Sequence, residues 1–187
     1  MFLRIKKRTN HSGKTYEYAY CVENKYRKRR KMPKQKVKQY LGRVYRFEKK
    51  INNEIETLEN LKNNFKQNSV LLIVNELKNY AFEQKEGVWT KENCCVNVEQ
   101  ALCMDQEGKD ICIAINDGFL HKTTINSLIA FKPKEGLERD IGKQLGNALI
   151  SAGIRPKEAV FIELFRQVMH SSSMISRSSS MTSNAKQ

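Results

Sequence analysis

The sequence predicts an α+β protein, with a three-stranded antiparallel sheet at the N-terminus, a long helix that backs this sheet, and a small αβ domain containing a β-hairpin and a C-terminal helical hairpin. Apolar and polar residues alternate in the first 45 residues, recur at spacings of three and four from residue 46, and return to short strand-like runs near residue 94. We therefore divide the chain into a basic β-meander (1–45), two connecting and packing helices (46–85), an αβ domain (86–170) and a disordered serine-rich tail (171–187).

Period-two patterns indicate three strands in the first segment. Residues 2–6 alternate apolar and basic, residues 16–23 place three tyrosines on one side, and residues 37–41 form a third run that Gly42 ends. A turn at residues 10–14 and a basic connection at residues 24–33 join them, as in an antiparallel meander. We expect Tyr18 and Tyr20 to be largely core, packed against the helix that follows.

The next segment has a helical period. Residues 46–67 contain no Gly or Pro and form an amphipathic pattern. Asn68 and Ser69 are read as a break and N-cap before a second helix at about residues 70–82. The apolar positions of the longer helix are Phe47, Ile51, Ile55, Leu58, Leu61 and Phe65.

The third segment returns to strands and then to helices. Residues 94–102 and 111–115 are predicted strands on either side of a turn at residues 105–108, which would make a hairpin. Helices are expected at about residues 123–131, 136–152 and 156–170, with Gly153 ending the second and Pro156 in the first turn of the third. Beyond His170 the serine-rich sequence has no apolar period, which predicts disorder.

Charge is concentrated at the N-terminus. The first 50 residues hold 18 Lys and Arg against three acidic residues, a net charge of +15, whereas the whole chain carries +14. A segment so basic attracts polyanions, and nucleic acid is the common polyanion of a cytosol. A solvated basic face that only keeps the protein soluble is the alternative interpretation.

Tyrosines alternate with cations in this segment, which suits contact with both phosphates and bases. We predict that the connection between the second and third strands is the main binding element. The predicted nucleic-acid-binding residues are Lys6, Arg8, Lys14, Lys25, Tyr26, Arg27, Lys28, Arg29, Arg30, Lys31, Lys34, Lys36, Lys38 and Arg43.

Other chemistry finds less support. Residues 12–15 (Ser-Gly-Lys-Thr) match the end of a phosphate-binding loop, but Arg8 replaces its first Gly and a strand follows instead of a helix. Four cysteines cluster at residues 94–112 without the short spacing of a zinc knuckle, so buried thiols explain them better. The three histidines are far apart in sequence and give no Cys–His pair. The two C-terminal helices could form a helix-turn-helix, but the second is too apolar for a groove-facing helix. No cofactor is expected.

The N-terminal segment resembles that of certain DDE-type insertion-sequence transposases. The resemblance lies in the tyrosine-rich strand at residues 16–23, the basic connection, and the run Lys-Gln-Lys-Val-Lys-Gln-Tyr-Leu-Gly-Arg at residues 34–43. It covers about 45 residues and implies contact with DNA. It does not extend to strand transfer, because residues 46–170 offer neither the length nor the three spaced acids of a transposase core.

Two function classes remain from the sequence. The first is a nucleic-acid-binding protein without catalysis, with DNA slightly favoured over RNA. A ribosome-associated role is a close variant of this class, and a truncated or accessory transposase-related protein is a distant one. The second is an adaptor that self-associates as a homo-oligomer through residues 46–82. With no apolar run long enough for a membrane span, no visible export signal and irregularly spaced cysteines, the sequence favours a cytoplasmic protein with no membrane partner.

Overall fold

The structure is a computed structural model, and it describes residues 2–27, 32–52, 61–134 and 136–181. The chain begins with three strands that form an antiparallel meander, as the period-two patterns predict. They are β1 (Phe2–Thr9), β2 (Thr15–Arg27) and β3 (Met32–Arg46). The α+β class is confirmed, with an N-terminal three-stranded antiparallel arrangement, a second small sheet and C-terminal helices.

The meander is part of a larger mixed sheet, because β3 pairs in parallel with a strand from much later in the chain. The sheet order is β1-β2-β3-β8-β9, where β8 is Ile111–Ile115 and β9 is Gly118–Leu120. The sequence interpretation ended the third strand at Gly42, which is wrong. Gly42 instead has a φ of +120° within β3, where the strand passes so close to Asp110 that a Cβ would lie 2.0 Å from its carbonyl oxygen. Only glycine permits that approach.

The second sheet is a four-stranded antiparallel meander of short strands. In order these are β4 (Glu83–Lys85), β5 (Val88–Lys91), β6 (Cys94–Asn97) and β7 (Leu102–Asp105). The helices in the described part of the chain are α1 (Phe65–Asn79), α2 (Lys122–Ile129), α3 (Glu138–Ser151) and α4 (Glu158–Met181). The helices, the second sheet and β8 enclose the main core, in which Ile73, Leu77, Leu145 and Leu164 are fully buried.

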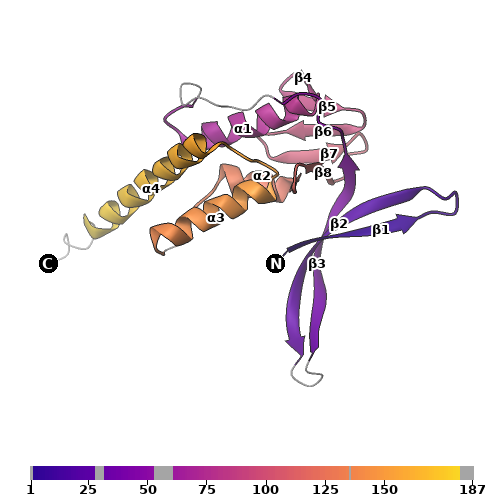
Figure 1. The fold of residues 1–187 in the computed structure, drawn as a ribbon, viewed down its shortest axis with the longest axis horizontal. Coiled ribbons are helices and arrows are strands. Elements are labelled where there is room, and N and C mark those ends of the chain that lie inside the picture. The colour runs from indigo at the N-terminus through magenta and orange to yellow at the C-terminus, as the bar shows by residue number, and fades with distance from the viewer. Residues whose placement is uncertain (1, 28–31, 53–60, 135, 182–187) are drawn as a thin grey trace.

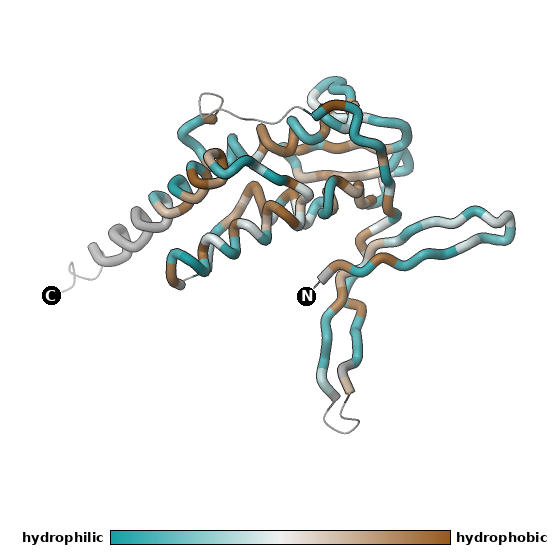
Figure 2. The backbone as a smooth tube through the Cα atoms, in the orientation of Figure 1, coloured by the Kyte–Doolittle hydropathy of each residue, from teal (hydrophilic) through white to brown (hydrophobic). Residues whose placement is uncertain are grey.

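Strand β8 joins the two halves of the molecule. All five of its residues are buried, since Ile111, Ile113 and Ile115 face the main core while Cys112 and Ala114 face a smaller core against β2 and β3. A strand covered on both faces is expected to be apolar throughout. Figure 1 shows the result: two β-hairpin arms, β1–β2 and β2–β3, project from a body made of the second sheet and the helices. In Figure 2 the apolar chain lies mainly in the body, and the arms are largely hydrophilic.

The predicted long helix at residues 46–67 is wrong over most of its described part, since only residues 65–67 are helical, as the start of α1. β3 continues through Arg46, residues 47–52 and 61–64 are not helical, and residues 53–60 lie outside the described part. The apolar positions serve different neighbours: the Phe47 ring packs edge-on against Phe82, at a centroid distance of 5.4 Å, whereas Ile51 is 51% exposed. Within the described part of residues 46–67, no helix therefore backs the N-terminal sheet.

The start of the next helix also differs from the sequence prediction. Asn68 and Ser69 do not break a helix: α1 starts at Phe65, its N-cap is Asn64, and Asn68 lies buried within it, where its side chain bonds to the backbone of Lys62. Asn68 is buried inside the helix because its amide is hydrogen-bonded. Asn is more often found at caps and turns, so the residue type alone does not suggest this position.

The predicted hairpin around residues 105–108 is also wrong. Residues 94–102 form β6, a turn and the start of β7, whereas β8 enters the other sheet, so the two predicted strands do not pair with each other. An isolated bridge between Met104 and Asp110 lies just outside both of them.

The C-terminal helices lie near their predicted positions. Gly153, at φ +78°, follows α3 as expected, whereas α4 starts at Glu158 instead of at Pro156. The expected disorder from residue 171 is wrong up to Met181, because α4 extends that far; residues 182–187 lie outside the described part. The division of the chain into domains stays a prediction.

Candidate nucleic-acid interface

The distal part of the β2–β3 hairpin is a two-stranded ribbon. We call residues 23–27 and 32–36, which pair beyond the end of β1, the β2–β3 ribbon. Lys25 lies directly opposite Lys34, and Glu23 opposite Lys36, so these four residues share one face of the ribbon. All three lysines are exposed. Like charges directly across a strand pair are destabilising, by roughly 0.2–1 kcal/mol, and a bound polyanion would relieve this repulsion.

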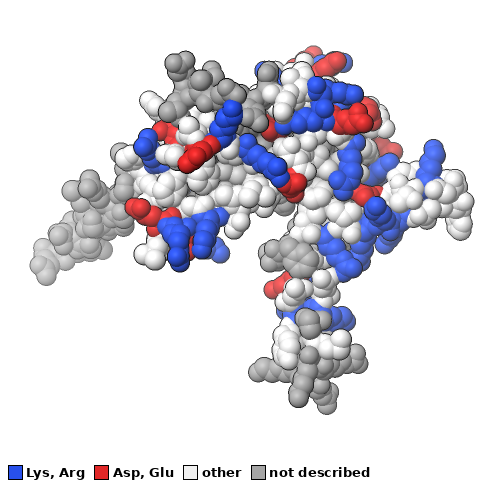
Figure 3. All heavy atoms as spheres, in the orientation of Figure 1, with Lys and Arg blue, Asp and Glu red and all other residues white. Residues whose placement is uncertain are grey.

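The root of the arms carries a second group of cations on a tyrosine-covered surface. Register places the members of this group on one face of β1, β2 and β3. We call it the tyrosine–cation face; it comprises Arg4, Lys6, Arg8, Tyr16, Tyr18, Tyr20, Tyr40, Arg43 and Tyr45. Figure 3 shows Lys and Arg gathering where the two arms diverge.

Cations on this face lie over aromatic rings. The Arg43 guanidinium is 4.3 Å from the Tyr16 ring centroid and 5.0 Å from that of Tyr45. Lys6 lies 5.0 Å from the Tyr20 ring centroid. Such contacts orient a cation without neutralising it, so its charge stays available to phosphate.

The tyrosine rings also contact one another and remain partly exposed. Tyr40 lies 5.4 Å from Tyr20 and 6.3 Å from Tyr18, measured between ring centroids, and is 53% exposed. Tyr18 and Tyr20 are half-buried instead of core, because the helix expected to cover them does not form in the described residues. Partial burial raises the pKa of Tyr40 and of Tyr45, so both phenols stay neutral near pH 7. The face is an open aromatic surface.

The opposite face of the same strands is apolar and packs inward. Ala19, Leu41 and Val44 are buried with Cys112 and Ala114 of β8. At its margin Glu17 pairs with Arg46 at 2.8 Å and with Lys7 at 3.5 Å, and the hydrogen bond from Arg46 lowers the Glu17 pKa below its usual value. These two cations are thus already paired.

The predicted site residues fall into separate groups. Lys6, Arg8 and Arg43 lie on the tyrosine–cation face, Lys25, Tyr26, Lys34 and Lys36 on the ribbon, and Lys14 in the turn between β1 and β2. Lys38 pairs with Glu23 at 3.2 Å. Lys28, Arg29, Arg30 and Lys31 lie outside the described residues, and Arg27 is described only in its backbone. Tyr26 is 66% exposed.

A cavity beside the tyrosine–cation face is a feature that the sequence did not suggest. It has a volume of about 640 Å³ and lies between β3 and the turn that joins β7 to β8. Tyr18, Tyr40, Arg43 and Tyr45 line one side. The other side consists of Asn93, Asp105, Gln106, Glu107, Lys109 and Asp110. The parallel pairing of β3 with β8 brings these two segments together.

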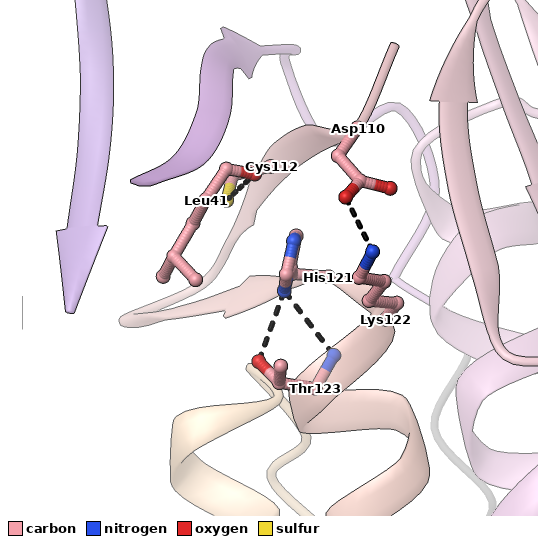
Figure 4. A network of polar contacts seen from close by, with 6 residues as sticks. All are labelled: Leu41, Asp110, Cys112, His121, Lys122 and Thr123. Atoms are coloured by element: carbon pink, nitrogen blue, oxygen red, sulfur yellow. Dashed lines mark hydrogen bonds and ion pairs between the residues drawn. The ribbon is translucent and has the colours of Figure 1, made fainter. Parts of the chain in front are cut away.

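A buried polar cluster under β3 brings a cysteine and a histidine into one region, which the sequence also did not suggest (Figure 4). His121 is buried at the N-cap of α2, where its Nδ1 accepts a hydrogen bond from the Thr123 backbone N–H at 3.2 Å. Burial lowers the His121 pKa. The Cys112 thiol donates to the Leu41 carbonyl oxygen at 3.7 Å, and burial raises its pKa to about 12. A neutral capping histidine and a protonated thiol suit a structural role better than nucleophilic chemistry.

The remaining motifs have structural explanations. Residues 12–15 lie at the turn between β1 and β2, as predicted, and β2 starts at Thr15. Cys94 and Cys103 are buried with raised pKa values, the former at about 12. Among the residues that the structure describes, no group of three or more metal-ligating side chains is assembled.

Comparisons with known proteins give no functional assignment. No protein-family model, curated protein or solved structure matches this chain. Within the described ranges, no helix is both long and apolar enough to cross a membrane.

Proposed function

We propose that this protein binds nucleic acid through its N-terminal β-module, contacting the phosphate backbone, and carries out no catalysis of its own. The observation that carries the proposal is the arrangement, on two projecting arms, of cations that form no salt bridge with the described residues. Lys25 and Lys34 face each other across the ribbon, while Lys6 and Arg43 lie over tyrosine rings at its root. Such a surface repels itself and attracts a polyanion.

The dimensions of the ribbon fit a duplex. Five residue pairs at about 3.3 Å per residue give a length of roughly 17 Å. The major groove of B-form DNA is about 12 Å wide and admits a two-stranded β-ribbon. A ribbon inserted there would bring Lys25, Lys34 and Lys36 within reach of phosphates on both strands. The resemblance of residues 16–43 to a DNA-contacting segment favours DNA slightly over RNA.

The alternative of a self-associating adaptor loses its main support. It relied on the two helices predicted over residues 46–82, and the described part of this stretch is helical only from Phe65 to Asn79. Charge on the arms, in contrast, does not depend on that helix.

Paired triple variants test the proposal. We expect Lys25→Gln, Lys34→Gln and Lys36→Gln together to weaken binding of the full chain to 20-base-pair duplexes of two unrelated sequences by about 100-fold near 0.15 M salt, if three phosphate contacts are lost. The control variant, Lys85→Gln with Lys132→Gln and Lys143→Gln, removes the same charge from exposed positions on the body and should retain most of the affinity. Equal losses in both variants, or no measurable wild-type binding, would reject the proposal.

A further inference from the structure

The cavity between the tyrosine–cation face and the β7–β8 turn has properties unlike those of the surrounding cationic surface. Its volume of about 640 Å³ is ample for a single nucleobase. Three tyrosines line one wall, and three carboxylates, those of Asp105, Glu107 and Asp110, lie along the other.

The carboxylates make the cavity unsuitable for phosphate. Asp105 accepts hydrogen bonds from the backbone N–H groups of Glu107 and Lys109, at 3.0 and 2.9 Å, which holds it in place. Glu107 pairs with Lys109, and Asp110 with Lys122. These pairs leave the acidic wall close to neutral overall and without an unpaired cation of its own; Arg43, on the aromatic wall, can meet a phosphate at the cavity margin, but a phosphate inside would face the carboxylates. An uncharged group is the better occupant.

The aromatic wall is equally unsuited to a cationic ligand. Arg43 already lies over the Tyr45 ring, and Arg8 lies 5.8 Å from the Tyr18 ring centroid. A second cation would be repelled by both. Tyr40 is the tyrosine of this wall whose ring has no cation over it among the described residues, and it is 53% exposed. Its ring contacts Tyr18 and Tyr20 at tilted angles, and its exposed part can stack on a planar, uncharged ligand.

We infer that this cavity receives one unpaired nucleobase of the bound nucleic acid, stacked on Tyr40 and bordered by the Arg43 guanidinium. The inference rests on the proposed function and adds the class of nucleic acid, namely strands with an unpaired or extruded base. The neighbouring Lys6 and Arg8 would hold the phosphates that flank this base. Polar side chains on the opposite wall, Asn93 and Gln106 among them, would meet its edge.

The test compares an uninterrupted 20-base-pair duplex with the same duplex carrying a single-nucleotide bulge. Stacking of one base on an aromatic ring predicts that full-length protein binds the bulged duplex roughly 5- to 150-fold more tightly. Tyr40→Leu should abolish this preference, measured as the ratio of the two affinities for the same variant, whereas Tyr40→Phe should keep it. Thermal melts confirm that both variants fold, which the exposure of Tyr40 favours.

A second readout needs no variant. With 2-aminopurine at the bulge, transfer of the base from the duplex to a tyrosine stack should change its fluorescence in proportion to binding. If both duplexes bind equally and the fluorescence is unchanged, the inference is wrong while the proposed function stands. If neither duplex binds, the proposed function itself is wrong. A preference for the bulge that survives in Tyr40→Leu would place the base elsewhere and overturn the assignment to this cavity.

Discussion

Replacing Gly42 by Ala should be among the most damaging single substitutions in this protein. The added Cβ would lie 2.0 Å from the Asp110 carbonyl oxygen, 2.7 Å from its carbon and 2.8 Å from the Ile111 Cα. All three are backbone atoms, so no side-chain rotation relieves the overlap. The φ of +120° is itself strained for alanine, by about 1–3 kcal/mol.

Relief of the overlap requires β3 to move away from β8. The two strands pair in parallel over four residues, from Arg43 with Ile111 to Arg46 with Ala114. Each hydrogen bond lost there costs about 0.5–1.5 kcal/mol net. We therefore expect Gly42→Ala to lower the free energy of unfolding by at least about 3 kcal/mol, a large part of the 5–15 kcal/mol typical of a folded protein.

Two other glycines provide matched controls for equilibrium unfolding in urea. Gly13 also has a positive φ, +78°, but nothing lies within 4 Å of its added Cβ, so Gly13→Ala isolates backbone strain at about 1–2 kcal/mol. Gly146 lies within α3 with open space around it, and Gly146→Ala should stabilise the protein by about 1 kcal/mol. A Gly42→Ala variant within 1 kcal/mol of wild type would refute the close approach of β3 to β8.

Three further predictions concern buried or paired ionisable groups. Because burial lowers the His121 pKa, the unfolded chain binds the proton more tightly than the folded chain. The free energy of unfolding should therefore be highest above the unfolded pKa of about 6.5 and should fall as the pH drops below it. His121→Asn keeps a capping side chain and should flatten this dependence in thermal melts between pH 7.5 and 5. Glu17 also has a lowered pKa, so its contribution to stability is present above the usual pKa of 4.5 and is lost as the pH falls through the pKa of the folded protein. Glu17→Gln should therefore reduce the loss of stability measured between pH 5 and 3. In iodoacetamide labelling at pH 8, Cys94, Cys103 and Cys112 should stay unmodified in the folded protein and react in denaturant, because burial raises their pKa values. Rapid labelling of any of the three in the native state would contradict their buried placement.

The strands and helices that local pattern specifies were predictable, whereas long-range pairing was not. The tyrosine-rich strand follows from its period of two, and the end of α3 from Gly153. The pattern at residues 46–67 misleads because an apolar spacing of three and four also arises when each residue serves a different contact, as Phe47 does with Phe82. Propensity in a window cannot distinguish these cases.

The position of Gly42 in the strand pattern is compatible with two structures. A glycine at the end of a strand pattern indicates either a strand end or a close backbone approach, and here the second holds because β8 lies against it. The partner strand is about 70 residues away, so no local pattern identifies it.

The candidate site was predictable in composition but not in arrangement. Lys6, Arg8 and Arg43 were among the residues predicted from the basic composition of the first 45 residues, and the register places them on one face of the meander. That Tyr18 and Tyr20 are partly exposed depends on a helix that does not form in the described residues, and the cavity at Tyr40 depends on the β3–β8 pairing. Both are tertiary features.

The salt dependence of binding by the wild-type chain tests the central claim most directly. If Lys25, Lys34 and Lys36 of the ribbon and Lys6, Arg8 and Arg43 at its root each neutralise one phosphate, the logarithm of the association constant for B-form DNA should fall with the logarithm of salt concentration with a slope of about −5. The ribbon triple variant should reduce that slope to about −3. A wild-type slope near zero, or one that the ribbon substitutions leave unchanged, would contradict the claim that these arms hold the phosphate backbone.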